Sequence, residues 1–142
     1  MRFMVMVKAT KDSESGKMPD QAMLEAMTKF NEELVSAGVM LAGEGLQPSS
    51  KGARLKFSRD GRRIVVDGPF AETKELIAGF WLWQVKSMDE AVEWLKRCPN
   101  PMSSTSEVEI RQVFSPEDFG PALTPELRAS EERLRAQLGE KA

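Results

Sequence analysis

An acid at the end of a short apolar run is the first candidate for chemistry. Asp67 follows Ile64–Val66 and precedes Gly68-Pro69, a dipeptide that turns the chain. A carboxyl group at a strand end, beside a turn and near apolar walls, is able to act as a general acid or base. The alternative is structural: Asp67 caps backbone N–H groups of Phe70–Lys74, because Asp is a preferred capping residue. We favour capping over catalysis.

Other residues are candidates for holding a small ligand. Glu44 lies between two glycines, and their small size lets a ligand approach the backbone; an exposed bend is an equally good interpretation. Two tryptophans share one face of a predicted strand, where they wall a pocket for a flat ligand or, more commonly, anchor a core or an interface. The candidate ligand-binding residues are Glu44, Gln47, Arg54, Glu72, Lys74, Trp81 and Trp83.

Two of these candidates carry opposite charges. Glu72 and Lys74 are two positions apart, and one of them could line a cleft and pair with Arg54. The alternative is a solvated surface pair, which stabilises a fold by less than ~1 kcal/mol.

Histidine is absent from the 142 residues. The usual general base and the commonest metal ligand are therefore missing, and Asp, Glu, Lys, Arg or Cys must carry any acid–base chemistry. The single cysteine, Cys98, has no histidine base and precedes Pro99, which favours a buried structural thiol over a nucleophile. Neither a metal-ligand spacing nor a complete glycine-rich phosphate loop is visible, so the sequence predicts no cofactor and no metal.

The composition limits the partners. A chain of 142 residues predicts one domain, and the net charge of −2 argues against a nucleic-acid partner. Nothing approaches the ~20 consecutive apolar residues of a membrane span, and no secretory apolar region is visible. One cysteine fits a reducing compartment, so a cytoplasmic location is expected.

The elements that must position these candidates alternate between strands and helices. An amphipathic helix begins with Pro19 at its first position and ends at Gly38, and a second helix follows Ser87. Asp60-Gly61 predicts a hairpin. The segment Lys11–Lys17 is expected to be a polar loop. Strands are predicted at Met1–Ala9, Val39–Ala42, Ala53–Ser58, Arg62–Val66, Ile77–Val85 and Glu107–Arg111.

This order predicts an α+β plait with a mainly antiparallel sheet and both helices on one face. The first strand is apolar on both faces, because Phe3, Val5 and Val7 alternate with Met4 and Met6. The face without helices therefore needs a cover, since an exposed patch of that size is unusual on a monomer. We expect a homodimer with the two sheets face to face.

One stretch resembles a known family. The run Asp67–Glu75, with its Asp-Gly-Pro-Phe start, and Gly79-Phe80 are similar to the signature of the DGPF branch of the YCII-related family. Val39–Leu46 resembles that family's segment after the first helix, and Glu107–Arg111 resembles its last strand. The resemblance covers about residues 1 to 114, and residues 115 to 142 form a C-terminal extension outside it.

The resemblance implies a ferredoxin-like fold that dimerises through its sheet as a dimeric α-β barrel. Enzymatic action is suspected in the family from a histidine and an aspartate, and Asp67 is the candidate for that aspartate. The histidine is expected in the segment Gly-Glu-Gly-Leu-X-Pro-Ser-Ser, where this chain has Gln47 at X. Glutamine does not exchange a proton near neutral pH. Family genes often lie beside sigma-factor genes of the extracytoplasmic-function type, which implies a regulatory partner.

The C-terminal extension predicts a helix. Thr124-Pro125-Glu126 supplies a cap, a proline and an early acid. Leu127, Leu134 and Leu138 form a thin apolar stripe. A helix this short is not stable alone, so we expect it to pack on the dimer, with a partner-binding tail as the alternative.

Three functions follow as hypotheses. The leading one is a dimeric module that binds a small molecule, with a weak or regulatory enzymatic role, in a cleft bordered by Asp67, Glu44, Gln47, Arg54 and the tryptophan face. The second is an enzyme with Asp67 as general acid or base and Lys74 or Arg54 holding an anionic substrate. The third is an interaction partner in transcription regulation of the sigma-factor type.

Overall fold

The computed structural model describes residues 1–139 and contains two sheets and four α-helices. Short 3-10 turns occupy Ser49–Lys51 (η1), Thr73–Glu75 (η2) and Pro116–Ala122 (η3). The strands are β1 (Arg2–Lys8), β2 (Met40–Gly45), β3 (Ala53–Phe57), β4 (Arg63–Asp67), β5 (Ile77–Gln84) and β6 (Val108–Gln112). The helices are α1 (Lys11–Glu14), α2 (Gln21–Ser36), α3 (Met88–Lys96) and α4 (Pro125–Gly139).

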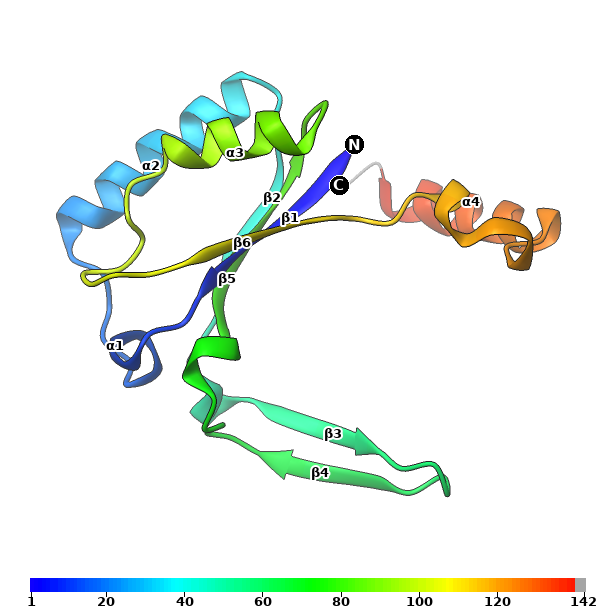
Figure 1. The fold of residues 1–142 in the computed structure, drawn as a ribbon, viewed down its shortest axis with the longest axis horizontal. Coiled ribbons are helices and arrows are strands. Elements are labelled where there is room, and N and C mark those ends of the chain that lie inside the picture. Colours follow the sequence, from blue (N-terminus) through cyan, green and yellow to red (C-terminus); the bar gives the residue numbers. More distant parts are fainter. Residues whose placement is uncertain (140–142) are drawn as a thin grey trace.

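The larger sheet has four antiparallel strands in the order β2-β5-β1-β6. Helices α2 and α3 lie side by side on one of its faces, and no helix within residues 1–139 covers the other (Figure 1). The predicted α+β plait is thus confirmed. We call the second face, which carries the side chains of Met4, Met6, Phe80 and Leu82, the open face.

The core lies between the sheet and the two helices. Phe3 and Val5 from β1, Trp83 from β5 and Leu34 from α2 have fully buried side chains. Burying each such apolar side chain stabilises the fold by roughly 1.5–3 kcal/mol. Phe30 packs edge-on against Trp83, with ring centroids 6.3 Å apart. These contacts hold α2 against the sheet.

Helix α2 begins two residues later than the sequence predicts. The carboxylate of Asp20 accepts a hydrogen bond from the backbone N–H of Met23 at 2.8 Å, so Asp20 is the N-cap and Pro19 lies before the helix. A side-chain cap outweighs the tolerance of proline at a first position. The end is as predicted, with Gly38 in the left-handed conformation at φ 72°.

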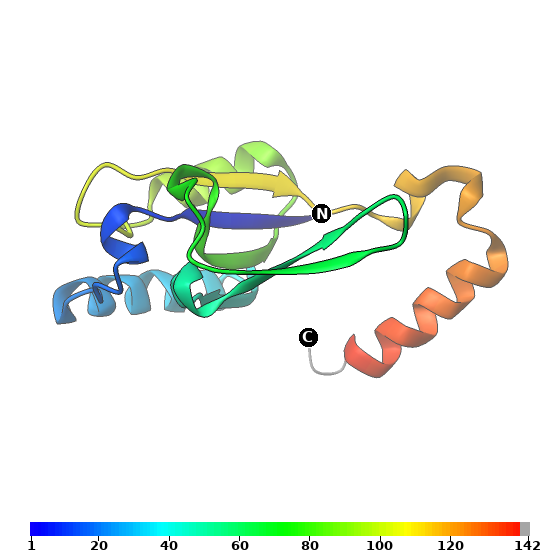
Figure 2. The same cartoon turned by 90° about the horizontal axis from the view of Figure 1, so that it is seen from below.

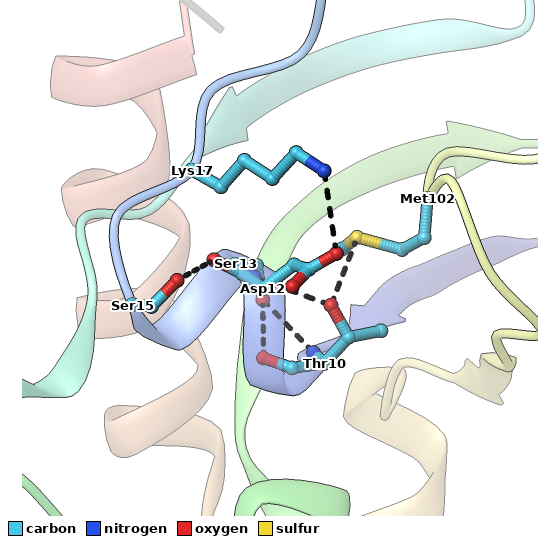
Figure 3. A network of polar contacts seen from close by, with 6 residues as sticks. All are labelled: Thr10, Asp12, Ser13, Ser15, Lys17 and Met102. Atoms are coloured by element: carbon cyan, nitrogen blue, oxygen red, sulfur yellow. Dashed lines mark hydrogen bonds and ion pairs between the residues drawn. The ribbon is translucent and has the colours of Figure 1, made fainter.

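The segment after β1 is not the predicted polar loop, because it forms the single-turn helix α1. Thr10 and Ser13 cap it reciprocally, each side-chain oxygen accepting a hydrogen bond from the other residue's backbone N–H. Lys17 pairs with Asp12 at 3.6 Å, and the hydroxyl of Thr10 contacts the sulfur of Met102 (Figure 3). These local bonds to short polar side chains fix the position of α1.

Strands β3 and β4 form a separate two-stranded ribbon, which we call the arm. Its predicted Asp60-Gly61 turn is confirmed, with Gly61 at φ 89°. Every residue of both strands is exposed, including Phe57 at 65% and Val65 at 65%. Figure 1 shows the arm reaching away from the sheet on the side opposite α2 and α3.

The C-terminal segment, residues 113–139, also projects. Thr124 caps α4 as predicted by accepting from the N–H of Leu127 at 3.2 Å. Arg128 pairs with Glu117 at 2.9 Å and ties α4 to η3. A backbone hydrogen bond and that guanidinium lower the pKa of Glu117. Both views show α4 standing away from α2 and α3 (Figures 1 and 2).

Among residues 1–139, no helix is both long and apolar enough to cross a lipid bilayer.

Candidate functional site

The Asp-Gly-Pro-Phe turn joins the arm to the sheet and is packed tightly against η1. A Cβ atom at Gly68 would lie 1.7 Å from the backbone oxygen of Ser49, so only glycine fits. The N–H of Gly68 donates to the carbonyl of Gly52 at 3.0 Å. The turn and η1 therefore form one unit at the base of the arm.

A carboxylate from α1 completes this unit. Glu14 accepts hydrogen bonds from both the backbone N–H of Ser49, at 2.9 Å, and the hydroxyl of Ser49. The same hydroxyl accepts from the N–H of Phe70 at 3.1 Å. Charge-assisted bonds of this kind are stronger than neutral ones. Sequence reasoning missed Glu14 and Ser49, because they are 35 positions apart and no local pattern links them.

The favoured structural role of Asp67 is wrong. No hydrogen bond joins its carboxylate to the N–H groups of Phe70–Lys74 or to any other group within residues 1–139, and Ser49 takes the N–H of Phe70 instead. The hydroxyl of Ser49 reaches that N–H because η1 folds under the turn. The side chain of Asp67 is exposed in the single chain and is available to a ligand or a second protomer.

Arg54 lies close to Asp67 along the arm but on its other face. Arg54 pairs in register with Val66, and Asp67 pairs with Ala53. Adjacent positions of a ribbon point to opposite faces, so the two side chains do not share one cleft within a chain. The guanidinium of Arg54 lies 3.8 Å above the centroid of the Phe70 ring. This cation–π contact stabilises the turn by roughly 0.5–1 kcal/mol at an exposed site.

The expected pairing of Arg54 with Glu72 or Lys74 does not occur within the described chain. Glu72 and Lys74 are exposed in and beside η2, and no ion pair in residues 1–139 joins either to Arg54. Stacking on Phe70 occupies the guanidinium instead. Gln47 is exposed between β2 and η1. The turn connections thus bring these four candidates to the base of the arm without direct bonds among them.

Glu44 lies on the sheet itself. The predicted strand Val39–Ala42 extends further, because β2 runs to Gly45, and the interpretation of Glu44 as an exposed bend is therefore wrong. Glu44 is paired in register with Phe80, and directly opposite residues of an antiparallel pair share a face. Its carboxylate therefore stands on the edge of the open face, one strand away from apolar side chains.

The two tryptophans lie on the helix-covered side and not beside the other candidates. Trp81 is 6% exposed and Trp83 is 0% exposed. The indole N–H of Trp81 donates to the side-chain oxygen of Asn31 at 2.9 Å. A pocket wall needs an accessible ring, so both residues act as core anchors in the single chain.

The open face has an apolar centre and charged margins. Met4 and Met6 stand beside Leu82 and Phe80 in register, and all four are half-buried without a covering element from residues 1–139. On the β6 side the neighbours are Arg111, opposite Met4, and Glu109, opposite Met6. Glu109 pairs with Lys8 at 3.6 Å. Such a surface suits apolar contact with polar groups at its rim.

Two hollows lie on the opposite side of the molecule from the arm. The larger has a volume of about 490 Å³ and is lined mainly by α3 and β6. The smaller, about 230 Å³, lies near Cys98. Burial raises the pKa of the Cys98 thiol to about 11, so the thiol is protonated at neutral pH, as expected of a structural cysteine.

Comparison with known proteins identifies relatives of the whole sheet domain. The sequence profile of the YCII-related domain matches residues 1–115. An uncharacterised protein of Rhizobium meliloti (strain 1021) is 36% identical over 97 residues, which are 68% of this chain and 77% of that protein. The C-terminal segment from residue 116 lies outside the profile match.

Proposed function

Because the chain belongs to the YCII-related family and carries an uncovered apolar sheet face, we propose that it is a homodimeric module that binds a small molecule. The observation that carries the proposal is the open face. Met4, Met6, Phe80 and Leu82 have no cover from the described chain, and a second copy turned by a two-fold axis would cover them with the same residues.

The base of the arm supplies the polar half of the proposed site. Glu44 stands on the rim of the open face, and the exposed carboxylate of Asp67 has no hydrogen-bond partner within residues 1–139. Gln47 and Lys74 lie on the connections that flank this region. Ligand sites combine apolar walls with a few convergent polar groups. The second sheet would provide the missing wall.

The ligand is tested by native mass spectrometry of protein purified gently from its source cells. We expect a dimer that carries a stoichiometric small mass. The variant Glu44→Ala should lose that mass, and Glu32→Ala, an exposed acid on α2, should retain it. A dimer that never carries a small mass, in extracts or with added metabolite mixtures, would contradict the ligand-binding role.

The second candidate is an enzyme that uses Asp67 as a general acid or base. It is supported by the missing capping bond, which leaves the carboxylate reachable, whereas the exposure of Asp67 in the single chain counts against it unless a second protomer encloses the carboxylate. An asparagine at this position should therefore preserve the fold. If the wild-type protein converts the extracted small molecule and Asp67→Asn does not, the enzyme role holds; equal conversion by both would exclude Asp67 from it.

A further inference from the structure

An apolar groove remains open on the helix-covered side of the sheet. It is a shallow, largely open depression between α3 and the edge strand β6, with a volume of about 490 Å³. The strand contributes Val108 and Ile110, which also pack against the core from the helix-covered face. The lining residues are Met88, Val92, Leu95, Lys96, Val108 and Ile110. Apart from the ammonium group of Lys96, this lining is apolar.

Helix α4 carries an exposed apolar stripe. Its 15 residues carry the stripe of Leu127, Leu134 and Leu138, which are 53%, 52% and 68% exposed. These positions lie within about 40° of one another around a helix with 3.6 residues per turn. A helix of this length is marginal without tertiary contacts. The stripe therefore needs an apolar surface to cover it.

The side of the sheet on which α4 lies favours a second copy as the source of the helix that fills the groove. The groove lies on the helix-covered side of the sheet. Helix α4 stands beyond the open face, on the other side of the sheet (Figure 1). A protomer's own α4 would have to cross its sheet edge to reach its own groove. Two sheets packed face to face lie ~10 Å apart, so the helix layer of the second copy lies further out on the side where α4 stands.

We propose that α4 of one protomer docks in the groove between α3 and β6 of the other. This inference rests on the proposed homodimer and adds a reciprocal exchange of C-terminal helices. Two-fold symmetry gives two identical contacts, so each dimer has two occupied grooves. Helix α4 lies outside the family-matched residues, whereas the groove lies within them.

Cysteine cross-linking tests the contact in the full chain. In a Cys98→Ser background, Val92→Cys in the groove is combined with Leu134→Cys on the stripe, and a short bis-maleimide is added. The control pair combines Val92→Cys with Ala136→Cys, which lies on the opposite side of α4. We expect a product of twice the chain mass from the first pair and little from the control.

Several outcomes separate the claims. An intrachain link in the first pair, or equal products from both pairs, would overturn the helix exchange. A dimer by native mass spectrometry without the Val92–Leu134 link would overturn it while leaving the dimer in place. A monomer would overturn the homodimer as well, and a different captured protein on α4 would show that the stripe serves another partner.

A second measurement does not depend on cross-linking. Leu134→Lys should raise the dissociation constant of the dimer about tenfold, because a charge replaces an apolar anchor. Ala136→Lys should leave that constant unchanged. Equal constants for both variants and the wild type, measured by analytical ultracentrifugation, would contradict the docking of the stripe.

Discussion

The two faces of the four-stranded sheet are both apolar but only one is covered. On the first, Trp83 and Leu34 are fully buried beneath the helices. On the second, Met6 and Phe80 lie half-buried with no covering element in residues 1–139. The difference shows that this chain completes one core by itself and leaves the second face uncovered within residues 1–139. The arm and α4 project on the side of the unfinished face (Figure 1).

The arm is a second region whose apolar side chains are uncovered. A two-stranded ribbon is marginally stable alone in water, and every residue of β3 and β4 is exposed. Its Leu55–Val65 pair would normally lie against a third layer. The ribbon therefore carries apolar residues that no other part of residues 1–139 buries.

The largest expected effect is in the finished core. Leu34→Ala should lower the free energy of unfolding by about 2–5 kcal/mol, because Leu34 is 0% exposed and truncation leaves a cavity. Leu24→Ala on the same helix is the control, since Leu24 is 54% exposed, and should change the free energy by less than about 0.5 kcal/mol. Urea denaturation of both variants measures the difference, and similar losses would contradict the assignment of the covered face.

The next effect is at the base of the arm. Gly68→Ala should destabilise the protein by about 1–3 kcal/mol, because the added Cβ meets the backbone oxygen of Ser49 at 1.7 Å and the backbone must move. Gly45→Ala has nothing within 4 Å of its added Cβ and serves as the matched control. If the midpoint temperature of thermal unfolding fell equally in both variants, the tight packing of the turn on η1 would be wrong.

A smaller effect is expected from the bond network beneath the turn. Ser49→Ala removes the hydroxyl that bridges Glu14 and the N–H of Phe70, and should cost about 1 kcal/mol, since these groups are only partly buried. Ser50→Ala, next in the chain and exposed, is the control. Amide hydrogen exchange at Phe70 should accelerate in Ser49→Ala alone. An unchanged exchange rate would contradict the hydrogen bond from Phe70 to Ser49.

The smallest effect is chemical. The Cys98 thiol should react slowly with iodoacetamide at pH 8 in the folded protein and quickly in urea, because its folded pKa is about 11 against an ordinary value of 9.0. The unfolded chain loses this proton near pH 9 and the folded chain keeps it until about pH 11. The thiol therefore lowers stability as the pH rises through that range. Equal alkylation rates in both states would contradict the burial of Cys98.

The fold was predictable from periodicity because its patterns are local. Alternating residues such as Phe3 and Val5, the Asp60-Gly61 turn, and the glycine at Gly38 each specify one element within a few positions. Starts of helices were less predictable. Asp20 caps α2 through one side-chain hydrogen bond, and Thr10 and Ser13 cap α1 reciprocally, in segments where a proline and a run of polar residues suggested other structures.

The candidate site was harder to predict because its contacts are distant in sequence. Several candidates do gather at the base of the arm, but Trp81 faces the helices and Arg54 stacks on Phe70. Alternation along a strand shows which residues share a face, but it does not show which of the two faces the helices cover. The link from Glu14 to Ser49 depends on a helix that the polar composition of its segment concealed.

The most direct test of the account is sedimentation equilibrium of the full chain at micromolar concentration, with Leu82→Asp as the disrupting variant. Leu82 stands at the centre of the open face, opposite Met4. We expect a dimer for the wild type and a folded monomer for Leu82→Asp, with helix content retained by circular dichroism. A wild-type monomer, or a dimer that Leu82→Asp leaves intact, would contradict the claim that the open face is an interface between two copies.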